Sequence, residues 1–97
     1  MQMFNPCHPG ECLREEMGDR ITITALATHL GVTRAHLSMI LNGRAGLSPL
    51  MSLKLDEAFR KSDGFWYRMQ QQYDLAQARR IKRKKIAPLV KPFKKAA

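Results

Sequence analysis

Apolar residues recur along this chain at intervals of three and four positions, which is the spacing of one face of an α-helix. The clearest stripe consists of Ile23, Leu26, Ala27 and Leu30, at positions i, i+3, i+4 and i+7. No segment alternates apolar and polar residues over a length sufficient for a strand. The pattern therefore predicts an all-α chain.

Capping residues divide this pattern into five predicted helices. Pro9 suits the first turn of a helix, where its missing N–H would be unpaired anyway. Thr22, Thr33 and Ser48 are candidate N-caps, because a hydroxyl accepts a hydrogen bond from a free backbone N–H. Gly31 suits a left-handed C-cap. The predicted helices run from Pro9 to Gly18, from Thr22 to Gly31, from Arg34 to about Leu41, from Ser48 to Phe59, and from a Ser62-Asp63 cap to about Arg83.

Two of these helices, 24–30 and 34–41, are joined by the short turn Gly31-Val32-Thr33. Short helices joined by a three-residue turn with a glycine are typical of the helix-turn-helix motif. Ala27 is small where the second helix must approach closely, and Leu37 holds that helix against the core. The spacing therefore predicts that the N-terminal end of helix 34–41 is exposed and faces a DNA major groove.

The exposed residues of this helix have the chemistry of base recognition. Arg34 can donate two hydrogen bonds to guanine, Ala35 can contact a thymine methyl, and His36 can donate to a base acceptor. Met39 offers an apolar contact further along the helix. The candidates for phosphate contacts are Thr24, Thr33, Ser38, Asn42 and Arg44. The alternative interpretation is a corner between two bundle helices with ordinary surface residues.

The fifth predicted helix carries a bulky face made of Phe65, Trp66, Met69 and Tyr73. These side chains can close the core, and they can also pack against a second copy, because four short helices rarely bury such a set alone. We therefore expect a homodimer that forms through these four residues. A twofold dimer would place two recognition helices about 34 Å apart, which predicts an inverted-repeat operator in double-stranded DNA.

Composition narrows the class of protein. Ninety-seven residues, of which 44% are hydrophobic and 26% charged, are typical of one soluble globular domain with an arm or tail. The chain has neither a secretory signal nor an apolar run near the roughly 20 residues of a membrane span, so no membrane partner is expected. Two cysteines are too few for a disulfide framework, which favours a cytoplasmic location.

The formal net charge of +9 resides in the C-terminal segment. Residues 79–97 hold nine basic and no acidic residues, whereas residues 1–78 hold eight of each. The case for DNA therefore depends on the helix-turn-helix and not on the total charge. We expect an arm at 1–8, a helix-turn-helix domain at 9–83 and a flexible basic tail at 84–97. The tail can add non-specific affinity for phosphates, act as a protease-accessible segment, or be a solvated end.

Catalytic and metal-binding patterns are missing from the sequence. Cys7, His8 and Cys12 match no standard zinc spacing, and His29 and His36 lie on separate predicted helices. No glycine-rich phosphate loop, nucleophile elbow or pair of catalytic carboxylates is present. We therefore expect no metal, no cofactor and no enzymatic activity.

Several motifs resemble those of a known family. The segment Leu26–Arg44 resembles the XRE (lambda-repressor-like) DNA-binding domain. His8-Pro9-Gly10-Glu11 resembles the opening motif of HigA-type antitoxins and the related VapI regulators. Residues 65–75 are similar to the FWLNLQ…YDL signature of that group, with Tyr67-Arg68-Met69 in place of its leucine-asparagine-leucine run. The resemblance extends from about His8 to Arg80.

The resemblance implies a five-helix, homodimeric repressor that binds an operator upstream of its own operon. It also implies an antitoxin that neutralises a RelE/HigB-type toxin, a small ribonuclease that cleaves messenger RNA. One alternative is a stand-alone XRE-family transcriptional regulator without a toxin partner. Another, from a different class, is a helical protein-interaction module that does not contact DNA.

Overall fold

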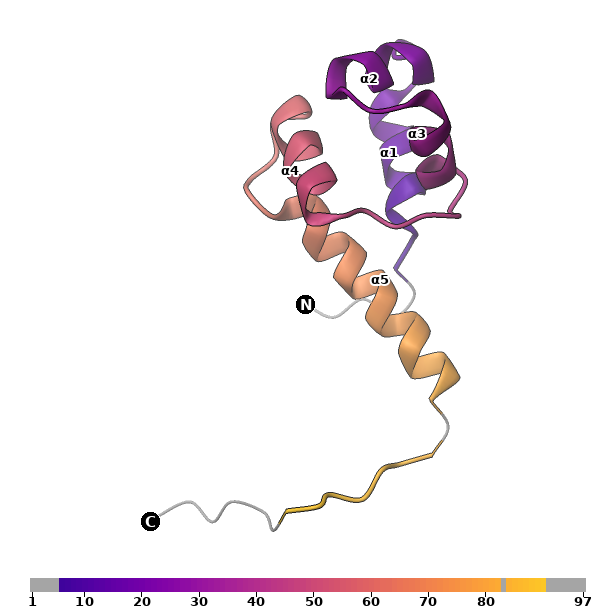
Figure 1. The fold of residues 1–97 in the computed structure, drawn as a ribbon, viewed down its shortest axis with the longest axis vertical. Helices are drawn as coiled ribbons and strands as arrows, with labels where there is room; N and C mark the ends of the chain where they lie inside the picture. Colours follow the sequence, from indigo (N-terminus) through magenta and orange to yellow (C-terminus); the bar gives the residue numbers. More distant parts are fainter. Residues whose placement is uncertain (1–5, 83, 91–97) are drawn as a thin grey trace.

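The computed structural model describes residues 6–82 and 84–90, and in that part of the chain it contains five helices and no strand. The helices are α1 (Pro9–Met17), α2 (Ile23–Leu30), α3 (Arg34–Leu41), α4 (Pro49–Ala58) and α5 (Phe65–Ile81). The first four helices gather at one end, and the longer α5 runs away from them toward the C-terminal segment (Figure 1). This confirms the predicted all-α fold with five helices.

Side-chain caps explain why α2, α3 and α4 begin where the sequence predicts. The hydroxyls of Thr22, Thr33 and Ser48 each accept a hydrogen bond from the backbone N–H three positions further on, at 3.1 Å. Gly31 ends α2 with a φ of 71°, a left-handed conformation that glycine adopts without strain. The residues predicted as caps of the helix-turn-helix therefore perform that role.

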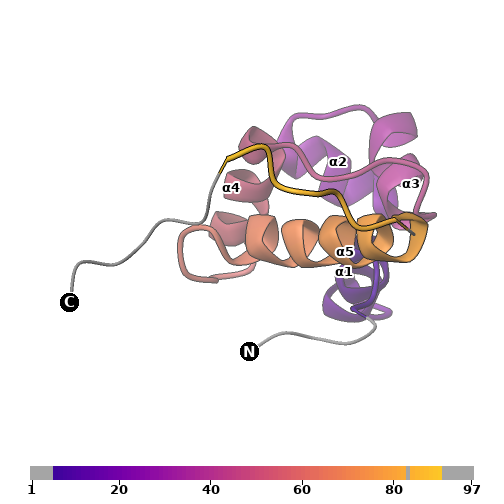
Figure 2. The same cartoon turned by 90° about the horizontal axis from the view of Figure 1, so that it is seen from below.

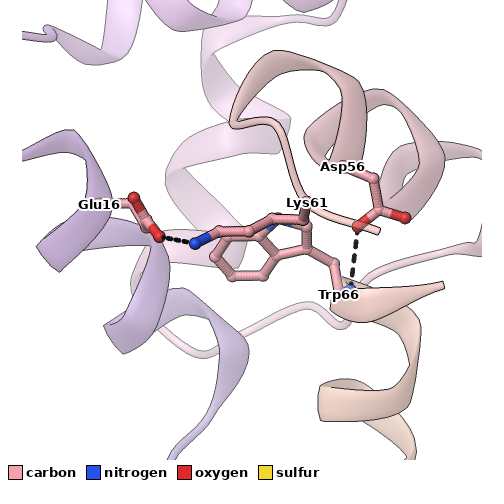
Figure 3. A network of polar contacts seen from close by, with 4 residues as sticks. All are labelled: Glu16, Asp56, Lys61 and Trp66. Carbon is pink, nitrogen blue, oxygen red and sulfur yellow. Dashed lines mark hydrogen bonds and ion pairs between the residues drawn. The ribbon is translucent and has the colours of Figure 1, made fainter. Parts of the chain in front are cut away.

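The start of α5 differs from the prediction. The expected caps Ser62-Asp63 do not cap the helix, which begins at Phe65 after Gly64 and has no side-chain cap of the local kind. Instead, the carboxylate of Asp56 in α4 accepts hydrogen bonds from the backbone N–H groups of Gly64, at 2.8 Å, and Trp66, at 3.1 Å (Figure 3). The cap is thus a tertiary contact between α4 and α5.

The apolar stripes of the helices meet in one core, and Trp66 is its largest side chain. Residues with no exposed surface come from four different helices: Leu13, Leu37, Ile40, Leu55 and Trp66. The sequence pattern left Trp66 open to the core and to a dimer interface. Its complete burial within the single chain places it in the core.

The chain leaves the helical region after Ile81. Lys82 has extended backbone, and residues 84–90 are exposed and contain neither helix nor strand. The predicted end of the domain at Arg83, most of the N-terminal arm and the last seven residues of the tail lie outside the described residues. Within the described part, no helix combines the length and the apolar character of a membrane span.

Candidate nucleic-acid interface

The N-terminal half of α3 lies on the surface of the molecule. All four residues predicted to contact bases are exposed: Arg34, Ala35, His36 and Met39. Leu37 and Ile40 are fully buried, so the opposite face of the helix is anchored in the core. The apolar face of α3 is therefore buried and its first turns are exposed to solvent, which is the arrangement of a recognition helix in this motif.

The hydroxyl and cationic side chains predicted to contact phosphates come from α2, from α3 and from the segments that flank α3. Thr24, Thr33 and Arg44 are exposed, whereas Ser38 is half-buried. The oxygen of Thr33 accepts a hydrogen bond from the backbone N–H of His36, which leaves the hydroxyl hydrogen free to donate. The N-terminus of α3 also carries the positive end of the helix dipole, which favours a nearby phosphate.

A polar network holds the C-terminal end of α3. Arg14 of α1 donates from Nε to the carbonyl oxygen of Leu41, at 3.2 Å, and from Nη2 to Oδ1 of Asn42, at 2.7 Å. Asn42 in turn donates from Nδ2 to the Ser38 hydroxyl, at 3.4 Å. One N–H of Asn42 remains for a phosphate. Arg14 was missed by the sequence analysis because it is 27 residues from Leu41 along the chain.

The motif His8-Pro9-Gly10-Glu11 sets the position of α1. A Cβ atom at residue 10 would collide with the carbonyl oxygen of Ile40, so glycine permits α1 to approach α3 closely. His8 caps α1, since its Nδ1 accepts from the backbone N–H of Gly10 at 2.9 Å. Its ring also meets Tyr73 of α5 edge-on, with ring centroids 4.9 Å apart. The motif therefore joins α1 and α5 to the C-terminal part of α3.

Gln70 of α5 fixes the loop that carries Arg44. Gln70 is 5% exposed, and its Oε1 accepts from the backbone N–H of Leu47 at 2.8 Å. Its Nε2 donates to Oδ1 of Asp74 at 2.9 Å, so both ends of the amide are bonded. The role of Gln70 was not predicted from the sequence. The available signal was its position one turn after Trp66, on the buried stripe of the helix.

The five helices and the exposed recognition helix define this protein as a lambda-repressor-like helix-turn-helix protein. The helix-turn-helix family model matches residues 13–66, more than half of the chain, and the chain belongs to that family. The XRE-type membership proposed from the motifs is thereby confirmed, and so is the expectation that the protein is not an enzyme, because these domains are DNA-binding modules.

Three individual proteins illustrate what this chain is similar to. Virulence-associated protein A' of Dichelobacter nodosus is 47% identical over 78 residues, which cover 78% of this chain and 68% of that protein. The structure of PA4674 from Pseudomonas aeruginosa in complex with its operator DNA is 37% identical, with a TM-score of 0.73 over 78% of this chain and 82% of that chain. The Pseudomonas aeruginosa antitoxin HigA with the higBA promoter is 35% identical, with a TM-score of 0.75 over 89% of this chain and 100% of that chain.

Proposed function

We propose that this chain is a sequence-specific DNA-binding antitoxin that represses its own operon and neutralises a RelE/HigB-type, mRNA-cleaving toxin. The observation that carries the DNA-binding part is the exposed first half of α3, anchored from behind by buried leucine and isoleucine. The similarity to a HigA antitoxin with its promoter, and to PA4674 with its operator, supports both parts of the proposal.

In this proposal each protomer inserts the N-terminal half of α3 into a major groove. Arg34 donates two hydrogen bonds to guanine, and Ala35, His36 and Met39 contact neighbouring base edges. The phosphates on either side are held by the residues that surround the helix: Thr24, Thr33, Ser38, Asn42 and Arg44. These contacts set the register of α3 in the groove, because phosphates are bound regardless of base sequence.

We assign the homodimer contact to the apolar side chains that α5 leaves partly exposed. Phe65, Met69 and Tyr73 are half-buried in the single chain and retain surface for a second copy. Further along the helix, Leu75 is 52% exposed and Ile81 is 76% exposed, so other sides of α5 also carry exposed apolar side chains. Pairing across this surface would bury it and give the twofold symmetry that an inverted-repeat operator requires.

Replacing Arg34 by alanine tests the DNA-binding part. Loss of a bidentate arginine–guanine contact costs about 1–3 kcal/mol per half-site, and a dimer loses it twice, so specific operator binding should disappear. The assay is fluorescence anisotropy with labelled DNA from upstream of the gene and a scrambled duplex. Arg68→Ala, which removes the same charge from the exposed surface of α5, should bind as the native protein does.

Unchanged operator affinity in Arg34→Ala would refute the assignment of the recognition helix and favour the protein-interaction module. The antitoxin part is tested by co-expression with the reading frame beside the gene. Rescue of the growth arrest that this neighbour causes is the expected result. Operator binding without any neighbouring growth inhibitor would leave the stand-alone regulator as the function.

A further inference from the structure

The acidic side chains of this basic protein are concentrated on α1 and the turn after it. Four of the eight acidic residues lie between positions 11 and 19: Glu11, Glu15, Glu16 and Asp19. Arg14, the basic residue within that stretch, is hydrogen-bonded to the end of α3. In Figure 2, α1 lies on the other side of α5 from α2. With Arg14 and Arg20 counted, residues 11–20 carry a formal charge of −2 in a chain whose net charge is +9, so the exposed carboxylates of α1 form a locally acidic surface.

A groove runs between this negative helix and the start of α5. It has a volume of about 280 Å³ and is lined by Cys12, Glu15, Glu16, Phe65, Trp66 and Met69. Lys61, in the α4–α5 turn, contacts two residues of this lining. Its Nζ pairs with Oε1 of Glu16 at 2.6 Å (Figure 3). The same Nζ lies 5.2 Å from the centre of the Phe65 ring. The groove thus combines an apolar floor with a carboxylate rim.

The rim keeps negative charge available to a partner. Burial raises the pKa of the Cys12 thiol, and its neighbours Cys7, Glu15 and Glu11 raise that pKa further, so the field of the carboxylates reaches the lining of the groove. Glu15 is exposed, and it forms no ion pair with any residue in the described part of the chain. A cation from another molecule can therefore pair with it without displacing a native contact.

We propose that the carboxylates of α1 beside this groove bind the toxin, a basic protein whose cationic side chains pair with Glu15 and Glu11, while Phe65 and Met69 stay available to the homodimer contact on α5. This inference rests on the proposed function. A ribonuclease needs a cationic surface to bind RNA phosphates, and carboxylates on α1 compete for that surface. Arg34 and Arg44, at α3 and in the following turn, would repel a basic toxin. The groove and the DNA-contacting set share no residue.

The charge reversal Glu15→Lys tests the proposal, with Glu57→Lys as the matched control. Both positions are exposed on helices and both changes add the same charge, but Glu57 lies on α4 outside the groove. The probe is a catalytically inactive form of the protein encoded beside the gene, titrated by calorimetry into the full-length chain. Glu15→Lys should weaken toxin binding about tenfold, and Glu57→Lys less than twofold. Both variants should have the same Tm and the same affinity for operator DNA.

The possible failures are distinguishable. Equal toxin affinity in the two variants would overturn the groove and leave the proposed function intact. A neighbouring protein that neither arrests growth nor binds this chain would overturn the antitoxin function and the groove together. If Glu15→Lys instead changes the rate of tryptic cleavage in the basic tail of the toxin-free protein, while toxin binding is unchanged, the occupant of the groove is the chain's own tail and the proposal is wrong.

Discussion

Replacing Asp56 by alanine removes the contact that begins α5. The carboxylate is 2% exposed and is shared by the backbone N–H groups of Gly64 and Trp66. Alanine at this position leaves both donors without a side-chain acceptor, and the N–H of Trp66 is buried where water cannot replace it. Because the Trp66 side chain is the largest in the core, loss of this cap loosens the helix that positions it.

The cost follows from the two lost hydrogen bonds. Each donor left unsatisfied by removal of its partner costs about 1–3 kcal/mol. We expect a total of about 3 kcal/mol, because Gly64 lies in a partly buried turn where water can replace the acceptor. For a domain of this size, 1 kcal/mol corresponds to about 4–8 °C in Tm, so the midpoint should fall by about 12–24 °C.

Thermal and urea unfolding followed by far-UV circular dichroism measure this effect, at one fixed protein concentration because a dimer unfolds in a concentration-dependent way. The matched control is Asp63→Ala, which removes the carboxylate that the sequence pattern assigned to the cap. Its free energy of unfolding should change by less than about 0.5 kcal/mol, as is usual for exposed positions. Equal destabilisation of the two variants would refute the assignment of the cap to Asp56.

Two further predictions concern α1. Gly10→Ala places a methyl group against the carbonyl oxygen of Ile40, so α1 must move away from α3. The free energy of unfolding, measured by urea titration, should fall by about 3 kcal/mol. An unchanged urea midpoint would mean that α1 and α3 are not in close contact at this position. At pH 8 the raised pKa of the Cys12 thiol leaves less of the reactive thiolate, so iodoacetamide should modify exposed Cys7 first. Peptide mass spectrometry measures both rates, and faster reaction of Cys12 would contradict the buried, negative environment.

Local signals were sufficient for most of the helical architecture. Thr22, Thr33 and Ser48 cap their own helices through the N–H three positions ahead, and Gly31 adopts the left-handed turn its position requires. These interactions join residues close in sequence, so their geometry is encoded in the spacing itself. The same holds for the candidate base-reading face, because burial of Leu37 and Ile40 leaves Arg34 and its neighbours on the outside of the same helix.

The polar contacts between helices could not be predicted from local sequence spacing. The sequence pattern assigned the cap of α5 to Ser62-Asp63, whereas Asp56 provides it from the preceding helix. Arg14 and Gln70 bind the end of α3 and the following loop, but their partners lie 27 and 23 residues away along the chain. Which polar side chain reaches which backbone group depends on how the helices cross, and that angle is set by packing of the whole core.

The sequence alone therefore determined that this chain is all-α, where α1 to α4 begin, and that α3 exposes its N-terminal half. The reason is that helix caps and apolar periodicity act over at most one or two turns. Only the tertiary structure decided that Trp66 is core rather than dimer surface, that Asp56 begins α5, and that the acids of α1 border an apolar groove. Those features arise where helices distant in sequence meet, because burial and charge at a point in space sum over every element packed around it.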